Sequence, residues 1–207
     1  MQRISAEALQ AGLSTVQPDG VACLLPLSCL PAAVPAPEFV LALDRIQDPG
    51  NLGTLLRTAR AAEIQQVWCA SGADPLAPKV VRSSAGAILS LPVERFGPDP
   101  DDGIAQLADR LRQARDAGLQ IVATLVPDAA ADLSVQPYWE LDWTLPTVLV
   151  LGNEGAGLAP SLQACCSDGV TLPHSSAVES LNVAAAAVPL LLERRRARMT
   201  SSTQTIG

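Results

Sequence analysis

Three short segments of this 207-residue chain combine hydrogen-bonding side chains with glycine or other small residues. The segments are DRIQDPGNLGTLLRTARAAE (44–63), LGNEGAGL (151–158) and TLPHSSAVESLNVAAAA (171–187). Their polar candidates are Asn51, Arg57, Glu154, Ser180 and Asn182. Amide, hydroxyl, carboxylate and guanidinium groups can orient a polar substrate and stabilise charge that develops during a reaction. The chemistry of these segments therefore suits a binding site or a catalytic site.

Each segment taken alone also has a purely structural explanation. Asn51 and Ser180 can cap helices, and Arg57 can be an ordinary helix-surface residue with Arg60 one turn further along. The glycine-rich turn around Glu154 leaves backbone amides open to a ligand, but it is weak evidence by itself. It matches neither the G-x-G-x-x-G fingerprint nor a Walker loop, which argues against nicotinamide cofactors and ATP.

Composition limits the class of protein. Hydrophobic residues make up 48% of the chain and charged residues 17%, so we expect a globular protein, and with 3% aromatics its core must be aliphatic. No apolar run is long enough to cross a bilayer, and the first residues do not resemble a signal peptide, so a cytoplasmic location is expected. The cysteines form no C-x-x-C pair, their number is odd, and the chain has one histidine. We therefore expect reduced thiols and no metal site.

The net charge of −7 argues against broad, nonspecific binding to nucleic acid. Any RNA contact must then use a local basic patch. One candidate is the cluster Arg194, Arg195, Arg196 and Arg198. The alternative is a solvated helix end, where cations favour the helix dipole, and composition alone favours this alternative.

Apolar runs and helical spacing alternate from residue 39 onward. Strands are expected at 39–44, 66–70, 91–96, 119–126, 147–152 and 169–173. Helices are expected at 51–62, 79–90, 101–117, 159–166 and 180–198. This alternation predicts an α/β fold with a mostly parallel sheet and helices on both faces. Each polar segment begins at a strand end, and ligands of such sheets bind at the carboxyl ends of the strands.

The three segments together, in this order, resemble the SpoU (TrmH) family of SPOUT methyltransferases. The resemblance is carried by DPGNLGTLLRTA, LGNEGAGL and SLNVAAAA, with KVVRSSAGA (79–87) between them, and covers about residues 39–198. It implies a C-terminal deep trefoil knot that holds S-adenosylmethionine (SAM), and a homodimer with the active site near the subunit interface. It also implies methyl transfer to a ribose 2′-hydroxyl, with ribosomal RNA favoured and transfer RNA as the alternative. An RNA-binding protein that has lost catalysis is a second hypothesis, and the intact polar set argues against it.

The resemblance assigns roles to individual residues. The positions expected to contact SAM are Thr124, Leu125, Gly152, Leu172 and Leu181. The positions that match the family's catalytic set are Arg57, Asn51, Glu154, Ser180 and Asn182. Arg57 is the family's proposed activator of the hydroxyl, but a guanidinium is a poor base because it keeps its proton at neutral pH. We therefore expect Arg57 to orient phosphate and to stabilise the developing alkoxide.

Two departures from the family pattern remain. His174 and Ser176 stand where relatives often have Met and Gly, and His174 is interpreted either as a loop residue or as an RNA contact. Residues 1–37 read as an extension or linker, or as the remnant of an RNA-binding domain of the L30e type. The expected organisation is completed by a methyltransferase domain at 38–200 and a flexible tail at 201–207.

Overall fold

The computed structural model describes residues 3–13, 19–97, 99–126 and 133–204, with no side chains described from 201 onward. The chain divides into two compact units, Met1–Leu30 and Pro31–Gly207. The first unit contains helix α1 (Ala6–Gly12) and a 3-10 turn, η1 (Leu27–Cys29). Ser5 begins α1, because its hydroxyl oxygen accepts a hydrogen bond from the Ala8 N–H at 3.1 Å.

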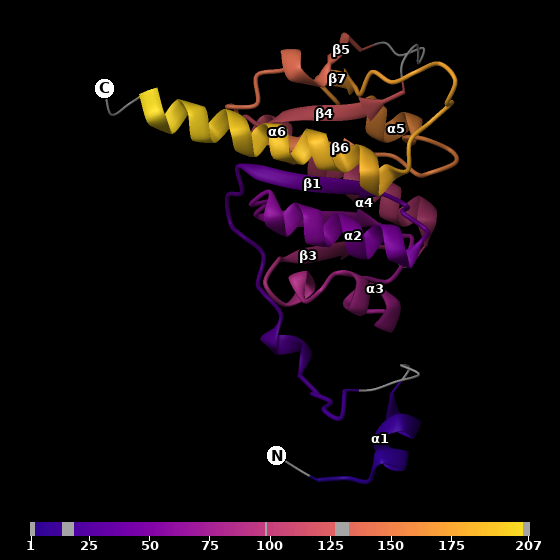
Figure 1. Ribbon diagram of the computed structural model, residues 1–207. Helices are drawn as coiled ribbons and strands as arrows, with labels where there is room; N and C mark the ends of the chain where they lie inside the picture. Colours follow the sequence, from indigo (N-terminus) through magenta and orange to yellow (C-terminus); the bar gives the residue numbers. More distant parts are fainter. Residues whose placement is uncertain (1–2, 14–18, 98, 127–132, 205–207) are drawn as a thin grey trace. The chain divides into compact units, whose positions relative to one another are not determined.

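A seven-stranded sheet forms the centre of the second unit (Figure 1), with the order β3-β2-β1-β6-β4-β7-β5. Every neighbouring pair of strands is parallel. The strands are β1 (Phe39–Asp44), β2 (Gln66–Ala70), β3 (Val93–Phe96), β4 (Gln120–Leu125), β5 (Val135–Pro137), β6 (Thr147–Leu151) and β7 (Asp168–Thr171). The expected parallel sheet is confirmed.

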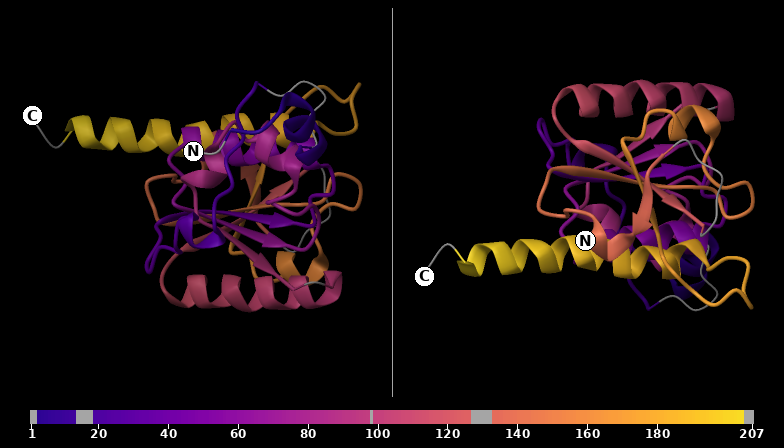
Figure 2. Two further views of the ribbon diagram at one scale, coloured as in Figure 1. Left: turned by 90° about the horizontal axis from the view of Figure 1, so that it is seen from below. Right: turned by 90° about the horizontal axis from the view of Figure 1, so that it is seen from above.

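Helices cover both faces of the sheet, as Figure 2 shows. The helical elements are α2 (Pro49–Ala61), α3 (Pro78–Ser83), η2 (Ala87–Leu89), α4 (Pro100–Asp116), η3 (Tyr138–Glu140), α5 (Pro160–Gln163) and α6 (Val183–Gln204). Helices α2, α3 and α6 lie on one face, and α4 and α5 lie on the other. Gly53 allows the close approach of α3 to α2, because a Cβ at this position would lie 1.8 Å from Ser83 Oγ.

Two apolar layers, one on each face of the sheet, form the core. Alternate residues of a strand point to opposite faces, so Leu41 packs in the layer under α2 and α6, whereas Val40 packs in the layer under α4 and α5. Both side chains are fully buried. Burial of such a side chain stabilises the fold by roughly 1.5–3 kcal/mol. The two central strands, β1 and β6, are thereby held in a fixed register, with Leu43 opposite Leu151.

The structure differs from the expected elements in four places. The helix expected at 159–166 spans only Pro160–Gln163. The helix expected at 79–90 is broken into α3 and η2, because Ala85 and Gly86 have left-handed backbone angles (φ 49° and 83°). Helix α6 begins at Val183 rather than at Ser180 and continues to Gln204, and residues 205–207 of the expected tail lie outside the described residues. Strand β5, of three residues, had no signal in the sequence.

No helix in the part of the chain that the structure describes is long and apolar enough to cross a membrane. Helix α6 illustrates why, since it carries Glu193 and four arginines.

Candidate active site

The site lies where the carboxyl ends of β1, β4, β6 and β7 meet. All four strands run in the same direction, so the segments that follow them emerge at one edge of the sheet. The Gly152–Leu158 loop, which we call the glycine loop, follows β6. The segment that leads to α6 follows β7. The three polar segments of the sequence are thus brought together.

A cavity of about 510 Å³ opens at this edge, a volume within the usual range of ligand sites. Its walls come from the end of β4, the glycine loop, the segment after β7 and the first turns of α6. All five positions that the sequence assigns to the cofactor line it: Thr124, Leu125, Gly152, Leu172 and Leu181. Glu154 and Ser180 of the predicted catalytic set line it as well. We refer to this cavity as the cofactor pocket, because it gathers the positions that the resemblance assigns to the cofactor.

A chain of side-chain hydrogen bonds lies at the rim of the cofactor pocket. The Asn182 amide donates to Asn51 Oδ1 at 3.0 Å, and the Asn51 amide donates to Glu154 Oε1 at 3.1 Å. The backbone N–H of Gln47 lies 3.4 Å from the other carboxylate oxygen, Oε2. Three of the five predicted catalytic residues are therefore joined directly, and they orient one carboxylate beside the pocket.

Arg57 lies apart from this group. Its side chain is exposed on α2 and does not line the cofactor pocket. It makes no hydrogen bond or ion pair with the residues that the structure describes. Within one chain, the structure brings together four of the predicted catalytic residues and leaves Arg57 outside.

The helix that carries Asn51 is capped by a different residue from the one that the sequence suggested. Asp48 is the N-cap of α2, and its Oδ1 accepts from the Asn51 N–H at 2.8 Å. That hydrogen bond is the main reason why the pKa of Asp48 is lowered, and the charge of Lys79 adds to it. Asn51 is thus freed from capping, and its amide turns to Glu154. Pro49 at the first helical position was the signal that could have identified Asp48.

The cap of α6 also differs from the expectation. Asn182, not Ser180, begins the helix, because its Oδ1 accepts from the backbone N–H groups of Ala184 at 3.0 Å and Ala185 at 3.2 Å. The same side chain donates to Asn51 through its other end. Both caps expected from the sequence were therefore wrong by a few residues, and both correct caps lie beside the site.

The glycine loop is a compact turn. Asn153 and Gly157 exchange two backbone hydrogen bonds of 3.0 Å, and Asn153 Oδ1 accepts from the N–H groups of Gly155 and Ala156. Gly152 admits no side chain, since a Cβ there would lie 2.6 Å from Gly157 C and from Leu158 N. The loop thus has a fixed shape at the wall of the cofactor pocket.

Both ends of the glycine loop are tied to the end of β1. The Asn153 amide donates to the Arg45 carbonyl at 2.8 Å. The fully buried carboxylate of Asp44 accepts from the Ala159 N–H at 2.8 Å, just beyond the loop. Neither Asp44 nor Asn153 was among the predicted site residues. An acidic residue at the end of an otherwise apolar strand was the available signal for Asp44.

His174 lies in the wall of the cofactor pocket. Its Nδ1 is 2.8 Å from the Leu172 carbonyl oxygen. A carbonyl can only accept, so Nδ1 carries a proton in this hydrogen bond and Nε2 of the neutral ring remains an acceptor. The sequence left two interpretations of His174 open, a loop residue or an RNA contact. In the structure, His174 lies beside the pocket.

The arginine cluster of α6 is largely neutralised. Arg195 pairs with Glu63, Arg196 with Glu193, and Arg198 with Glu38. These pairs favour the helix-surface interpretation over a basic RNA patch. Arg194 differs, because it is 1% exposed and its guanidinium stacks over the Phe39 ring at 5.0 Å. Its nitrogens have no hydrogen-bond partner among the described residues, and burial lowers the pKa of Arg194 to about 10.

All five cysteines are free thiols, and Cys69, Cys165 and Cys166 are buried. Burial raises the pKa of the Cys69 thiol to about 12, which makes it unreactive. Among the described residues, no group of three or more His, Cys, Asp or Glu side chains is arranged to hold a metal ion.

The fold and this site define a parallel α/β protein with a cofactor-sized pocket beside a fixed carboxylate. The chain belongs to the SpoU rRNA Methylase family, whose model matches residues 38–191. It is 40% identical over 202 residues to an uncharacterised tRNA/rRNA methyltransferase of Synechocystis sp., covering 97% of this chain and 69% of that protein. It is 37% identical over 163 residues to the 23S rRNA (uridine(2479)-2′-O)-methyltransferase of Streptomyces viridochromogenes, covering 78% of this chain and 54% of that one.

A solved structure is similar over most of the second unit. The SpoU methyltransferase AviRb from Streptomyces viridochromogenes, in complex with the cofactor AdoMet, superposes with a TM-score of 0.66. The sequence identity is 33%, and the match covers 84% of this chain and 65% of AviRb. The chain thus spans between about half and seven-tenths of the length of these relatives.

Proposed function

We propose that this protein transfers a methyl group from SAM to a ribose 2′-hydroxyl of RNA. One observation carries the proposal: the five positions expected at the cofactor line a single pocket, and the Asn182–Asn51–Glu154 chain of hydrogen bonds lies at its rim. The relative from Streptomyces is named as a ribose methyltransferase of 23S rRNA, and the AviRb structure holds AdoMet, which is SAM.

The residues of the cofactor pocket suit SAM. Leu172 and Leu181 offer apolar contacts, and the glycine loop allows a ligand to approach its backbone closely. Thr124 and Leu125, at the end of β4, would flank the adenine. When bound, SAM supplies an electrophilic methyl group on a sulfonium. The pocket would hold that group close to Glu154 and Ser180.

The polar rim would position the hydroxyl and take up the charge that develops on it. A ribose hydroxyl loses its proton as its oxygen takes the methyl group, and placement of that oxygen in line with the methyl supplies much of the rate. Glu154, fixed by Asn51 and by the Gln47 N–H, would accept a hydrogen bond from the ribose. Ser180 and Asn182 would complete the hydrogen bonding. Arg57 would orient an RNA phosphate and stabilise the alkoxide.

A homodimer and a trefoil knot complete the proposal. Val188, Leu192 and Met199 form an exposed apolar stripe along α6, and such stripes mark protein interfaces. The exposed position of Arg57, away from its own chain's pocket, also supports a site that is completed by a second copy. The return of the chain from β7, near one side of the sheet, to α6 beside α2 supports the knot.

For the substrate we favour ribosomal RNA, with transfer RNA as the alternative, in the cytoplasm. The name of the Streptomyces relative supports the first choice. Residues 38–200 would form the methyltransferase domain. Residues 1–37 would be a linker or the remnant of an RNA-binding domain.

Two measurements test the proposed function. Calorimetry should show binding of SAM or its demethylated product and no binding of NAD or ATP. Mapping of 2′-O-methyl groups in cellular RNA, with and without the gene, should reveal a site that depends on the gene. Binding of NAD without SAM, or an unchanged methylation map, would refute the proposal.

A further inference from the structure

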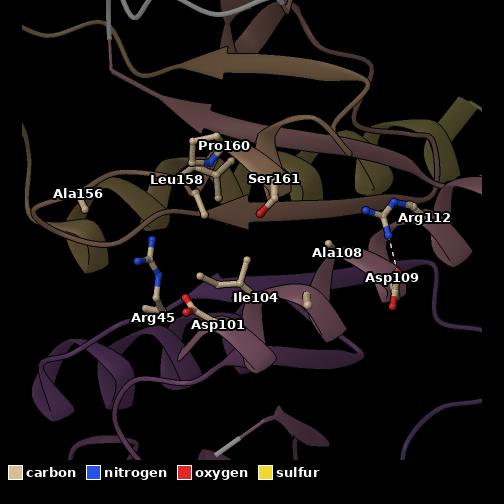
Figure 3. A pocket seen from close by; sticks show the side chains of 12 residues that line it. Arg45, Asp101, Ile104, Ala108, Asp109, Arg112, Ala156, Leu158, Pro160 and Ser161 are labelled. Carbon is tan, nitrogen blue, oxygen red and sulfur yellow. Dashed lines mark hydrogen bonds and ion pairs between the residues drawn. The ribbon is translucent and has the colours of Figure 1, made fainter. Parts of the chain in front are cut away.

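A second cavity lies on the other side of the glycine loop from the cofactor pocket. It has a volume of about 730 Å³ and lies between α4 and the start of α5 (Figure 3). Ala156 and Leu158 of the glycine loop belong to the walls of both cavities. A ligand in this second cavity, which we call the flanking pocket, would therefore be separated from the cofactor pocket by one loop.

Arg45 stands at one end of the flanking pocket and is held in a fixed plane. Its Nε donates to Asp44 Oδ1 at 2.6 Å, and its NH2 donates to Oδ2 at 3.1 Å. The carboxylate is fully buried and is itself fixed by the Ala159 N–H. The left-handed backbone of Arg45 (φ 51°) directs the side chain toward the loop residues Ala156 and Leu158, as Figure 3 shows. The guanidinium edge is thus occupied, and its face remains available for stacking.

Two cations and three carboxylates surround the flanking pocket, and both cations are paired. Arg45 and Arg112 stand at its two ends, and Asp101 and Asp109 stand beside them. Asp109 pairs with Arg112, and Asp44 pairs with Arg45. Between these charges lies an apolar floor formed by Ile104, Ala108, Leu158 and Pro160. A phosphate would need unpaired cations, whereas this lining suits a planar, uncharged group with hydrogen-bond donors and acceptors at its edge.

We propose that the flanking pocket binds an unpaired base of the RNA substrate, from a nucleotide next to the one that is methylated. The inference rests on the proposed function and deepens it. Proteins that read single-stranded RNA splay bases out and stack them on aromatic rings or on arginine planes. The residues that line this pocket include no aromatic ring, so the face of Arg45 supplies the plane. The Asp101 carboxylate and the Ser161 hydroxyl supply polar groups for the edge of the base.

The test uses the full chain and an unmodified 23S rRNA transcript that contains the mapped methylation site. Arg45→Ala removes the stacking plane. Ala105→Trp fills the pocket from α4 while leaving the Arg45–Asp44 pair intact, since Ala105 is exposed and lines the pocket. Gln106→Trp is the matched control, because Gln106 is the next residue on α4, is exposed and does not line the pocket. In parallel, the transcript is made abasic at each nucleotide that neighbours the methylated one.

We expect Arg45→Ala and Ala105→Trp each to lower kcat/KM for the transcript by about tenfold or more. Gln106→Trp should leave it unchanged, and SAM affinity should be the same in Ala105→Trp and Gln106→Trp as in the wild type. With the wild-type protein, one of the abasic transcripts should show the same loss of kcat/KM. Arg45→Ala should cause no further loss on that transcript, because the two changes remove the same contact.

Two results would overturn the inference. The first is full activity of Ala105→Trp. The second is that, for every abasic transcript, the loss of kcat/KM caused by the missing base and the loss caused by Arg45→Ala multiply when the two changes are combined. Failure of the proposed function has a different signature, in which the wild-type protein neither binds SAM nor methylates any transcript. In that case the inference fails with it.

Discussion

Asn51 and Asn182 stand 131 positions apart in the chain, yet the Asn182 amide donates to Asn51 Oδ1 at 3.0 Å. Asn182 uses its own Oδ1 to accept from Ala184 and Ala185 at the start of α6. One side chain therefore both begins the last helix and orients the amide that contacts Glu154. The amide nitrogen of Asn182 contacts Asn51 and its Oδ1 caps the helix, so a substitution can remove one of these interactions and keep the other.

Asn182→Asp should lower methylation by about tenfold without lowering the melting temperature. The carboxylate still accepts from the helix N–H groups and favours the helix dipole, but it cannot donate to Asn51. Rate measurements and thermal unfolding of the same samples check this. Asn182→Ala is the control, because it also removes the cap and should lower the unfolding free energy by about 1 kcal/mol. Full activity of the Asp variant would show that the hydrogen bond to Asn51 is unimportant.

Glu154→Gln should lower kcat by about 100-fold or more and leave SAM affinity nearly unchanged. The substitution keeps the size of the side chain but removes the charge that accepts from Asn51, from Gln47 and, in our proposal, from the ribose. Single-turnover methylation and calorimetry on the same variant separate the two effects. A variant that loses SAM binding and rate in equal measure would instead indicate that Glu154 supports the pocket.

Arg57→Ala should abolish methyl transfer and leave both SAM affinity and thermal stability nearly unchanged. The side chain is exposed, so its removal opens no cavity. Arg57→Lys should also be poor, because a point charge does not reproduce the planar fork that clamps a phosphate. Arg60→Ala on the same helix is the matched control, since Arg60 is also exposed and donates to Ser90 Oγ instead. Normal activity of Arg57→Ala would make it an ordinary surface residue.

Gly152→Ala should eliminate SAM binding, whereas Gly155→Ala in the same loop should bind SAM almost normally. A Cβ at Gly152 would overlap the backbone of Gly157 and Leu158 at 2.6 Å, so the loop must change shape. At Gly155 the nearest atom would be Asn153 Oδ1 at 3.7 Å, an ordinary contact. Calorimetry measures the SAM affinity of both variants. Equal affinities would show that SAM binding does not depend on the shape of the loop.

Arg194→Met should raise the unfolding free energy, by about 1 kcal/mol or more. A buried guanidinium without hydrogen bonds carries a desolvation penalty, and replacement of buried charges by apolar groups of similar size is often stabilising by about 1–4 kcal/mol. Loss of the stacking on Phe39 opposes this gain only in part. Urea unfolding measures the change, with Arg195→Met, an exposed ion-pair residue, expected within about 0.5 kcal/mol of wild type. Strong destabilisation by Arg194→Met would mean that Arg194 has a partner in solution.

The central strands were predictable because their physical signal is local. The FVLALD run and the TVLVL run are buried on both faces, and short continuous apolar runs rich in Val, Ile and Leu are typical of parallel strands inside a covered sheet. Helix ends were less predictable, because several polar residues near Asn51 and Ser180 can act as caps. In the structure, Asp48 and Asn182 are the caps. Asn182 also contacts Asn51, which belongs to a distant part of the chain.

The five positions expected at the cofactor line one pocket, because the motifs fix them relative to the strand ends. The ties of Asp44 to Ala159 and of Asn153 to Arg45 were not predicted. Each tie joins residues more than 100 positions apart. The periodicity or spacing within one segment does not predict with which distant backbone group a side chain will form a hydrogen bond. Spacing within one segment likewise does not indicate that Arg57 stands outside its own chain's pocket.

The order of strands in the sheet has a consequence for how the protein folds while it is being synthesised. Strand β1 pairs on one side with β2, which is made soon afterwards, but its other neighbour, β6, begins only at Thr147. While the ribosome makes the residues between them, one edge of a strand that is apolar up to Asp44 has no partner, and exposed strand edges promote aggregation. The sheet closes late and through distant pairings, which are the slow ones. The sheet therefore cannot close until Thr147 and the strands that follow it have left the ribosome.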